Sequence, residues 1–306
     1  MLGCGVPVSG AWATADSQVR LIELAEDLGY RSAWTFQRLL VPAEPDARSG
    51  IAAYHSVLDP VVSLAHLAGR TKRIRLGLAV LNMPYFSPAL MAKQLTTLDI
   101  LSAGRLDVGL GSGWSREEFI ASGVPYQHRG ERAEEFLRAL HSLWTDDVVD
   151  LSGRFYRIPP ARMLPKPVQR PHPPVLIGGG AEPALRRAGR LADGWISAAL
   201  ADLRHIDEPI AIVRQAAREA GRDPDTLRFV SRGPVRLGPA GPADRRPLTG
   251  SVEQVRGDLD DLHGKGVTEV FLDFNWDPEI SAPGADPVAA LQRAEETLMA
   301  LAPTNP

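Results

Sequence analysis

The sequence of 306 residues predicts a single (β/α)8 barrel, an α/β fold in which eight parallel strands alternate with helices. Eight strand-then-helix patterns follow one another without a break. The run Ile74–Leu81 is apolar throughout, which is typical of a parallel strand buried on both faces. Such barrels take about 250 residues, so the excess length is expected in loops. An open doubly wound sheet is the alternative, but the first turn, around Gly3 and Gly5, lacks the dinucleotide fingerprint expected there.

Each expected strand is a short apolar run bounded by Gly, Pro or polar residues. A helical pattern separates each strand from the next, and such crossovers join parallel strands. The expected strands are, in order, 2–8, 32–36, 74–81, 105–110, 175–178, 194–198, 227–237 and 268–275.

Each expected helix places apolar residues on one face, at i, i+3, i+4 and i+7. Ser87, Ser251 and Asp286 stand where a helix N-cap is required, and Ser251 also begins a capping-box pattern. Gly29 and Gly104 end two of the helices. The expected helices are 16–29, 60–70, 87–104, 133–144, 183–192, 206–217, 251–262 and 286–301.

Three connections that follow strands are unusually long, namely 37–58, 112–130 and 238–250. Barrel enzymes carry their chemistry on the loops at the carboxyl ends of the strands, so these loops are expected to cover a pocket. The basic segment 151–174 instead joins a helix to a strand and begins at the opposite face. We expect this insertion before strand five to wrap the barrel or contact another subunit, and anion binding by its basic residues is the alternative.

Two glycine-rich stretches end strands. The stretch Gly109–Trp114 would let a flat ligand approach the backbone closely, although glycines at barrel corners are also often structural. The stretch Gly178–Gly180 stands directly before a helix, where free N–H groups and the helix dipole favour an anion such as phosphate. A plain tight turn is the alternative for this second stretch.

Several classes of function lose support from the composition. The net charge of −3 offers no cationic surface for nucleic acid. No apolar stretch reaches the length of a membrane span, and the N-terminus lacks a signal-peptide pattern, so a cytoplasmic protein without a membrane partner is expected. The single Cys4 excludes a disulfide framework. No histidine pair has metal-ligand spacing and no G-x-S-x-G elbow is present, so neither a metal site nor a serine nucleophile is expected.

The motifs taken together resemble the luciferase-like monooxygenase superfamily, in particular its branch that uses the deazaflavin cofactor F420. The resemblance covers most of the chain. The residues that carry it include Gly29-Tyr-Arg-Ser-Ala-Trp34, Ile74–Leu81, Leu98–Leu106, Gly111-Ser-Gly-Trp114, Arg129-Gly-Glu-Arg132, Pro165-Lys-Pro167, Ile177-Gly-Gly179 and Ala192-Asp-Gly-Trp195.

The resemblance implies a barrel that is commonly dimeric, and hence a homodimer. It implies a non-prolyl cis peptide at Ala79-Val80, with Asn82 nearby, against which the cofactor ring would lie. Gly111, Gly113 and Trp114 would flank the ring. By the same resemblance, Gly178, Gly179 and Gly180 would bind the cofactor phosphate.

One position departs from the family pattern. Where many relatives have Asp-His after strand two, this chain has Gln37-Arg38. Arginine stays protonated near neutral pH, so Arg38 would bind an anion or polarise a carbonyl rather than donate a proton. Gln37 and Arg38 are the candidate catalytic residues, and Trp12, Tyr85 and Trp276 are candidate substrate contacts.

The leading hypothesis is an F420-dependent oxidoreductase that transfers a hydride between the deazaflavin and a small organic substrate. The first alternative is a two-component monooxygenase that depends on reduced FMN. The second, supported only by Arg38 in place of the histidine, is a flavin-binding barrel without catalytic activity.

Overall fold

A computed structural model describes residues 1–303. Eight strands pair in parallel in the order β1-β2-β3-β5-β8-β9-β10-β13, and β13 pairs back with β1 to close the sheet. The predicted (β/α)8 barrel is therefore confirmed. The barrel strands are β1 (Leu2–Gly5), β2 (Ser32–Thr35), β3 (Arg75–Leu78), β5 (Leu106–Gly111), β8 (Val175–Gly178), β9 (Gly194–Ile196), β10 (Arg228–Pro234) and β13 (Glu269–Asp273).

Helices surround the barrel, and several of them begin at the predicted caps. Ser87 and Asp286 cap α3 and α10, and Ser251 forms a complete capping box with Gln254 at the start of α8. The α-helices are α1 (Ala15–Asp27), α2 (Pro60–Ala68), α3 (Pro88–Leu101), α4 (Arg116–Ala121), α5 (Arg129–Thr145), α6 (Glu182–Leu191), α7 (Asp207–Glu219), α8 (Val252–Gly264), α9 (Pro278–Ser281) and α10 (Pro287–Ala300). Shorter elements in the connections are β4 (Leu81–Asn82), β11 (Arg236–Leu237), β12 (Thr249–Gly250), η1 (Ala52–Tyr54), η2 (Met83–Tyr85), η3 (Leu203–His205), η4 (Pro224–Thr226) and η5 (Phe274–Trp276).

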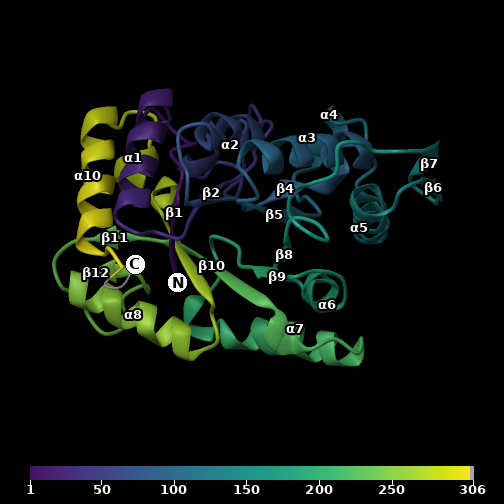
Figure 1. Ribbon diagram of the computed structural model, residues 1–306. Helices are drawn as coiled ribbons and strands as arrows, with labels where there is room; N and C mark the ends of the chain where they lie inside the picture. The colour runs from purple at the N-terminus through teal and green to yellow at the C-terminus, as the bar shows by residue number, and fades with distance from the viewer. Residues whose placement is uncertain (304–306) are drawn as a thin grey trace.

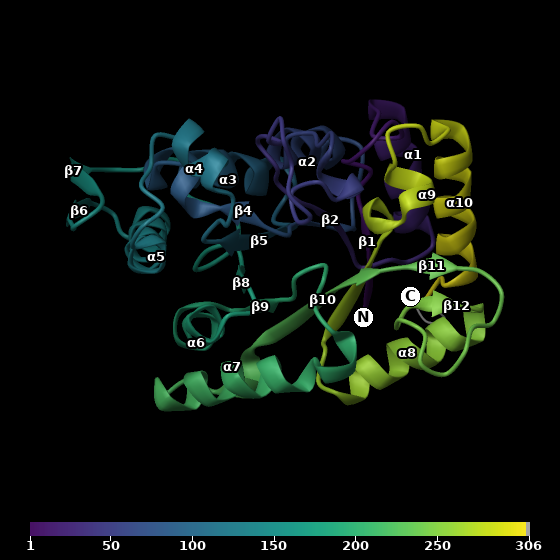
Figure 2. The ribbon, with the colours of Figure 1, turned by 180° about the vertical axis from the view of Figure 1, so that it is seen from behind.

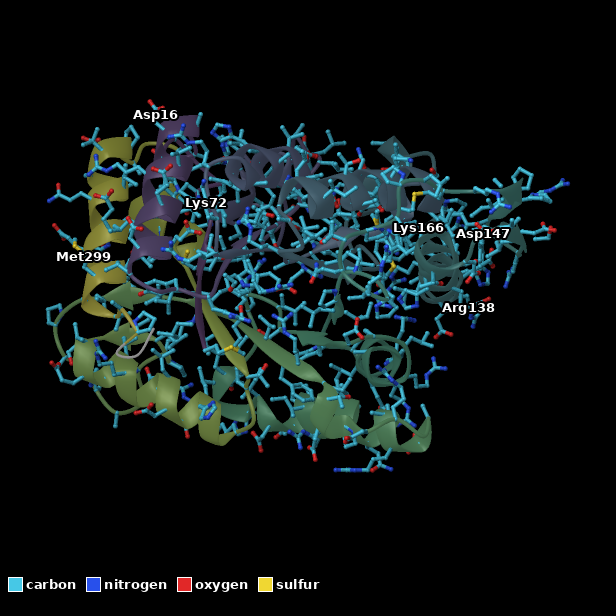
Figure 3. The ribbon with its side chains drawn as sticks, viewed as in Figure 1. Asp16, Lys72, Arg138, Asp147, Lys166 and Met299 are labelled. Carbon is cyan, nitrogen blue, oxygen red and sulfur yellow. The ribbon has the colours of Figure 1, made fainter. Side chains whose placement is uncertain are left out.

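The first and last helices, α1 and α10, lie side by side at one end of the view (Figure 1), and Met1 and Pro303 line one surface cavity. The insertion before β8 forms an antiparallel hairpin of β6 (Val149–Ser152) and β7 (Arg157–Ala161). Figure 2 shows this hairpin beside α5, projecting from the side opposite to α1 and α10. Charged side chains such as Lys72 and Asp147 lie on the outer surface (Figure 3).

Most of the strands end earlier at their carboxyl ends than the sequence pattern indicated, although β5 ends one residue later, at Gly111, and β8 ends where expected. The expected strand 2–8 ends at Gly5, and the expected strand 74–81 divides into β3 and β4. The division lies at the cis peptide Ala79-Val80, which confirms the family-based expectation. The apolar run in the sequence does not reveal where strand pairing stops, because the residues that leave the strand to line a cavity are as apolar as those within it.

The lower interior of the barrel is filled. Trp34 stacks on Phe271 with ring centres 5.4 Å apart, and a Cβ on Gly77 would lie 2.2 Å from the Trp34 ring. Beneath them, Asp107 and Glu269 are fully or almost fully buried near the amino ends of β5 and β13. Space for a ligand therefore lies at the carboxyl ends of the strands. In the described part of the chain, no helix combines the length and apolar character needed to span a membrane.

Candidate active site

A cavity of about 350 Å³ lies at the carboxyl ends of six barrel strands. Eleven of the residues singled out from the sequence line it, although they come from four separate parts of the chain. They are Gln37, Arg38, Ala79, Val80, Asn82, Gly111, Gly113, Trp114, Gly178, Gly179 and Gly180.

The three aromatic residues expected to contact substrate do not line this cavity. Trp12 has no exposed surface and packs in the core. Trp276 packs its ring edge-on against Tyr54, with centres 5.4 Å apart, and Tyr85 donates a hydrogen bond of 3.1 Å to Glu118 Oε2. These three expectations are corrected: Trp276 and Tyr85 contact residues that line the cavity, and Trp12 belongs to the core.

The Ala79-Val80 peptide forms the floor of the cavity, and the glycines around it provide the room that Val80 needs. A Cβ on Gly111 would lie 2.7 Å from one Val80 methyl, and a Cβ on Gly178 would lie 2.8 Å from the other. Both positions therefore require glycine for the same reason: the Val80 side chain, just after β3, packs against the backbone of β5 and of β8. The backbone N–H of Asn82 donates to Gln37 Oε1 at 2.9 Å, which fixes the Gln37 side chain above this floor.

Arg38 lies directly after β2 and is only 7% exposed. Its guanidinium carbon lies 4.5 Å from the centre of the Trp114 ring and 5.0 Å from that of Tyr54. Its Nε is 3.5 Å from Glu118 Oε1. Neither Nε nor Nη2 has a hydrogen-bond partner within residues 1–303.

Sequence reasoning missed Glu118 and Arg232, which also line the cavity. Glu118 is 2% exposed and anchors the loop after β2 by accepting from the backbone N–H of Leu39 at 2.8 Å. Arg232, in β10, donates from Nη2 to the carbonyl of Ala79, and its Nε lies 3.5 Å from Asp273 Oδ2. A charged residue inside an apolar strand run was a usable signal for Arg232. For Glu118 the signal was the pair Glu118-Phe119, which is one of the motifs that carry the family resemblance.

Burial changes the pKa of several groups around the cavity. Burial raises the pKa of Tyr54 and, together with the nearby Glu118 charge, that of Tyr85. Burial also raises the pKa of Asp273, against the opposing charge of Arg232. Among the described residues, no histidine lines this cavity. The lining instead carries four arginines and one glutamate, so the site favours anions.

The glycine stretch after β8 leads into α6 as expected. No side chain caps this helix, Gly179 has a φ of +123°, and a Cβ on Gly180 would meet nothing within 4 Å. Backbone N–H groups at an uncapped helix start favour an anion. Open space at Gly180 means that a phosphate can approach the backbone there.

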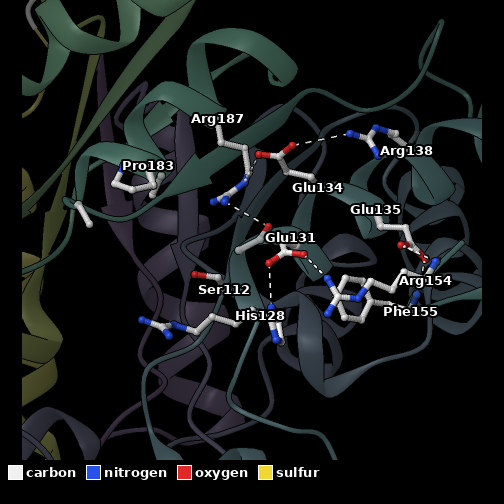
Figure 4. Close-up of a pocket in the computed structure, with 14 residues that line it drawn as sticks. Ser112, His128, Glu131, Glu134, Glu135, Arg138, Arg154, Phe155, Pro183 and Arg187 are labelled. Carbon is white, nitrogen blue, oxygen red and sulfur yellow. Dashed lines mark hydrogen bonds and ion pairs between the residues drawn. The ribbon is translucent and has the colours of Figure 1, made fainter.

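A second cavity, of about 740 Å³, adjoins the first and shares Ser112, Arg129, Ala181 and Ala184 with it (Figure 4). Its three glutamates are already engaged. Glu131 pairs with Arg154 and with His128, and Glu134 lies 3.5 Å from Arg187. Glu135 accepts from three backbone N–H groups of residues 154–156.

Arg129, at the junction of the two cavities, has no carboxylate partner within 4 Å among residues 1–303. Its guanidinium carbon lies 4.3 Å from the centre of the Tyr126 ring. This leaves one uncompensated cation beside the uncapped start of α6.

The fold and the cavity at the strand ends define a barrel enzyme. The sequence model of the luciferase-like monooxygenase family matches residues 5–246, and the chain belongs to this family. An uncharacterized protein of Mycobacterium tuberculosis is 38% identical over 209 residues, which are 65% of this chain and 73% of that one. An FMNH2-dependent dimethylsulfone monooxygenase of Pseudomonas putida is 41% identical over 140 residues, covering 44% of this chain and 38% of the monooxygenase.

Solved structures share the whole architecture. The monooxygenase RslO1 from Streptomyces bottropensis superposes with a TM-score of 0.78 at 25% identity, covering 97% of this chain and 98% of that chain. An F420-dependent secondary alcohol dehydrogenase superposes with a TM-score of 0.77 at 16% identity, covering 98% of both chains. At that identity, the second likeness speaks for the fold alone.

Proposed function

We propose that the protein is an F420-dependent oxidoreductase that transfers a hydride between the deazaflavin and a small organic substrate. The observation that carries this proposal is the second cavity, which continues from the glycine turn before α6 along Arg129 and Arg154. FMN ends at its phosphate, whereas F420 continues beyond the phosphate in an acidic tail. Four arginines and three glutamates line this cavity, and a small excess of positive charge beyond the phosphate position fits the longer cofactor.

The residues present fit a flat cofactor that ends in a phosphate. The floor at Ala79 and Val80 is apolar, and the open space at Gly180 lies beside an uncapped helix. Gly111, Gly113 and Trp114 would flank the ring, and Gly178–Gly180 would hold the phosphate through backbone N–H groups. Bound F420 supplies hydride chemistry, and bound reduced FMN supplies electrons for the activation of oxygen.

The side chains determine how a substrate would be held there. Arg38 remains charged and therefore orients an oxygen atom rather than protonating it. Within residues 1–303 the buried Gln37 Nε2 group has no hydrogen-bond partner, so it is a second donor available to a ligand. Both residues stand beside the floor on which the cofactor ring would rest.

A second candidate function is a monooxygenase that depends on reduced FMN. The observation that favours it is the 41% identity to the FMNH2-dependent dimethylsulfone monooxygenase over residues that make up 44% of this chain. Both functions use the same floor and the same phosphate position, and they differ in whether the second cavity receives a cofactor tail.

Anaerobic titration of the purified protein with F420 and with reduced FMN separates the two functions. We expect F420 to bind at micromolar concentration and more tightly than FMN. The Arg154→Gln variant, at a residue that lines the second cavity and not the first, should lose affinity for F420 and little for FMN, whereas Arg157→Gln, an exposed change on β7, should leave both unchanged. Micromolar binding of FMN without binding of F420, followed by oxygen consumption, would replace this proposal with the monooxygenase.

We further propose a cytoplasmic homodimer that uses the projecting β6–β7 segment. Leu164 and Val168, just after the hairpin, are 61% and 52% exposed, and Cys4 is a free buried thiol, as suits a reducing compartment. Light scattering of the purified protein should give the mass of two chains, and a double change of Leu164 and Val168 to Glu should give the mass of one. A wild-type protein that stays monomeric at tens of micromolar would contradict the dimer.

A further inference from the structure

Arg38 is a buried cation whose hydrogen-bonding capacity is unused. Its side chain lines the main cavity and is more than nine-tenths buried, yet Nε and Nη2 have no hydrogen-bond partner within residues 1–303. These two nitrogens form one edge of the guanidinium, the edge that can donate two parallel hydrogen bonds to the two oxygens of a carboxylate. A protein keeps an unsatisfied buried charge at a cost to stability, which indicates a ligand that completes it.

Glu118 balances part of this charge without using the Arg38 donors. Its Oε1 lies 3.5 Å from Arg38 Nε but accepts from the backbone N–H groups of Leu39 and Leu40, at 2.8 and 3.3 Å. Its Oε2 accepts from the hydroxyl of Tyr85 at 3.1 Å. The carboxylate is therefore committed to holding the loop after β2 and η2 in place.

The guanidinium is held in position by aromatic rings. Its carbon lies 5.0 Å from the ring centre of Tyr54 and 4.5 Å from that of Trp114, and Arg48 lies 4.0 Å from the same Trp114 ring. Cation–π contacts act on the faces of a guanidinium and leave its edges available for hydrogen bonds. A side chain fixed in this way loses little entropy when a ligand binds.

The position of Arg38 separates it from the phosphate cradle. Arg38 follows β2 and the glycine turn follows β8, with β3 and β5 between them in the barrel. Arg232, the other buried arginine of the cavity, is already engaged by the Ala79 carbonyl and lies 3.5 Å from Asp273. The anion that would pair with Arg38 is therefore not the cofactor phosphate. Arg232 does not offer an equivalent site, because its guanidinium already contacts protein groups.

We propose that the substrate is a small organic carboxylate whose two oxygens pair side-on with Nε and Nη2 of Arg38. This inference rests on the proposed function, because it assigns the substrate side of the same cavity. It gives Arg38 a role in substrate selection: neutral analogues of the same shape leave the guanidinium edge unsatisfied and are rejected.

Calorimetric titration of the cofactor-free protein with benzoate, benzamide and benzenesulfonate tests the proposal. Benzamide has the shape of benzoate without its charge, and benzenesulfonate carries the charge in a non-planar group. We expect benzoate to bind at least tenfold more tightly than either analogue. The preference should disappear in Arg38→Gln, decline in Arg38→Lys, and persist in Arg218→Gln, an exposed change on α7. Equal binding of benzoate and benzamide, no binding of either, or tighter binding of benzenesulfonate would overturn the proposal.

Thermal unfolding of the ligand-free variants separates a ligand site from a structural ion pair. Arg38→Gln removes the charge that faces the buried Glu118 carboxylate, so its melting temperature should fall, and the benzoate preference should fall with it. A lower melting temperature with an unchanged preference for benzoate would show a purely structural residue and contradict the proposal.

Repeating the benzoate titration with saturating F420 or reduced FMN, whichever binds, locates the site relative to the cofactor. Benzoate binding that persists supports the substrate assignment, and competitive displacement overturns it. If neither cofactor binds, the proposed function fails, while the comparison of benzoate with benzamide in the cofactor-free protein still decides the role of Arg38.

Discussion

Arg232 illustrates how a single buried side chain determines the shape of the cavity. It connects three strands, because it stands in β10, donates to the carbonyl of Ala79 after β3, and lies beside Asp273 at the end of β13. Its guanidinium carbon also lies 5.2 Å from the ring centre of Phe36 and 5.4 Å from that of Phe271. No local pattern in the sequence contains these contacts, since they form only when the barrel closes.

The glycines were predictable as a group, but the reason for each one was not. Gly109 is required for packing, because a Cβ there would lie 1.9 Å from the carbonyl oxygen of Leu78. At Gly180 the added atom would meet nothing within 4 Å. Glycines that look equivalent in the sequence therefore have different roles: Gly109 allows the strands to pack, and Gly180 leaves space in the cavity.

Gly180→Val should fold normally and lose cofactor affinity. The new side chain would enter the open space beside the start of α6, where the phosphate is expected. We predict at least about a tenfold loss, or ~1.4 kcal/mol of binding free energy, measured by titration with F420. Gly284→Val, a change at an exposed glycine with equally open surroundings, is the control and should bind as the wild type does. Unchanged affinity in Gly180→Val would place the phosphate elsewhere.

At the scale of elements, an ionic cluster joins four strands at the amino end of the barrel. Arg75 in β3 and Arg228 in β10 each donate to Asp107 in β5 at 2.7 Å, and Arg228 also donates to Glu269 in β13 at 3.1 Å. Burial opposes ionisation of Asp107, but the hydrogen bonds from Arg75 and the charge of Arg228 outweigh it and lower the pKa of this carboxyl.

Asp107→Asn should destabilise the barrel at neutral pH by about 3–5 kcal/mol, because it leaves buried arginines without their partner. A lowered folded-state pKa contributes stability above the unfolded value of about 3.9 and loses it as the pH falls through the folded value. The difference between the wild type and Asp107→Asn should therefore be full at pH 7 and shrink below about pH 4. Urea unfolding at pH 7 and pH 3 measures it.

The exposed pair of Asp225 and Arg214 provides the control for this prediction. Their atoms approach to 3.2 Å, but the Asp225 side chain is 77% exposed. Asp225→Asn should cost less than about 1 kcal/mol at both pH values. A pH-independent effect of Asp107→Asn would contradict the assigned ionic role.

Elements with regular periodicity were predictable, and those formed by tertiary contact were not. The capping box at Ser251 and the strand at 175–178 agree with the structure residue by residue. The β6–β7 hairpin was not expected, because its strands are largely polar and exposed and Pro159 and Pro160 lie within β7. Residues 79 and 80 were read as strand, although the chain leaves the ladder there.

At the scale of the whole molecule, closure of the barrel brings together loops that are distant in the sequence. The alternation of elements predicts which strand ends meet, and the family resemblance names most of the predicted residues that line the cavity, but neither identified Glu118 or Arg232 as lining it. The sequence did not predict which aromatic side chains face the cavity. Their direction depends on the conformation of the loops, and the alternation of strands and helices contains no information about that conformation. The net charge of the chain is −3, but the cavity is locally positive, because four arginines and one glutamate line it.

The charge of the second cavity makes cofactor affinity depend on salt. An increase from 0.05 to 0.5 M salt, a range chosen because the screening length falls to a few ångströms near its upper end, should weaken F420 binding more than FMN binding. The physical reason is that only the acidic tail of F420 reaches Arg154 and Arg187, which line the second cavity and not the first. Equal salt dependence of the two affinities, measured by parallel titrations, would remove the support that this cavity gives to F420.

The central claim is that the cavity at the strand ends binds F420 with its tail in the adjoining cavity. A crystal structure of the protein with F420 tests it most directly. We predict the deazaflavin ring against Ala79 and Val80, the phosphate at Gly178–Gly180 and the tail beside Arg129. A ring bound away from the Ala79-Val80 floor, or a tail that leaves the cavity in another direction, would contradict it.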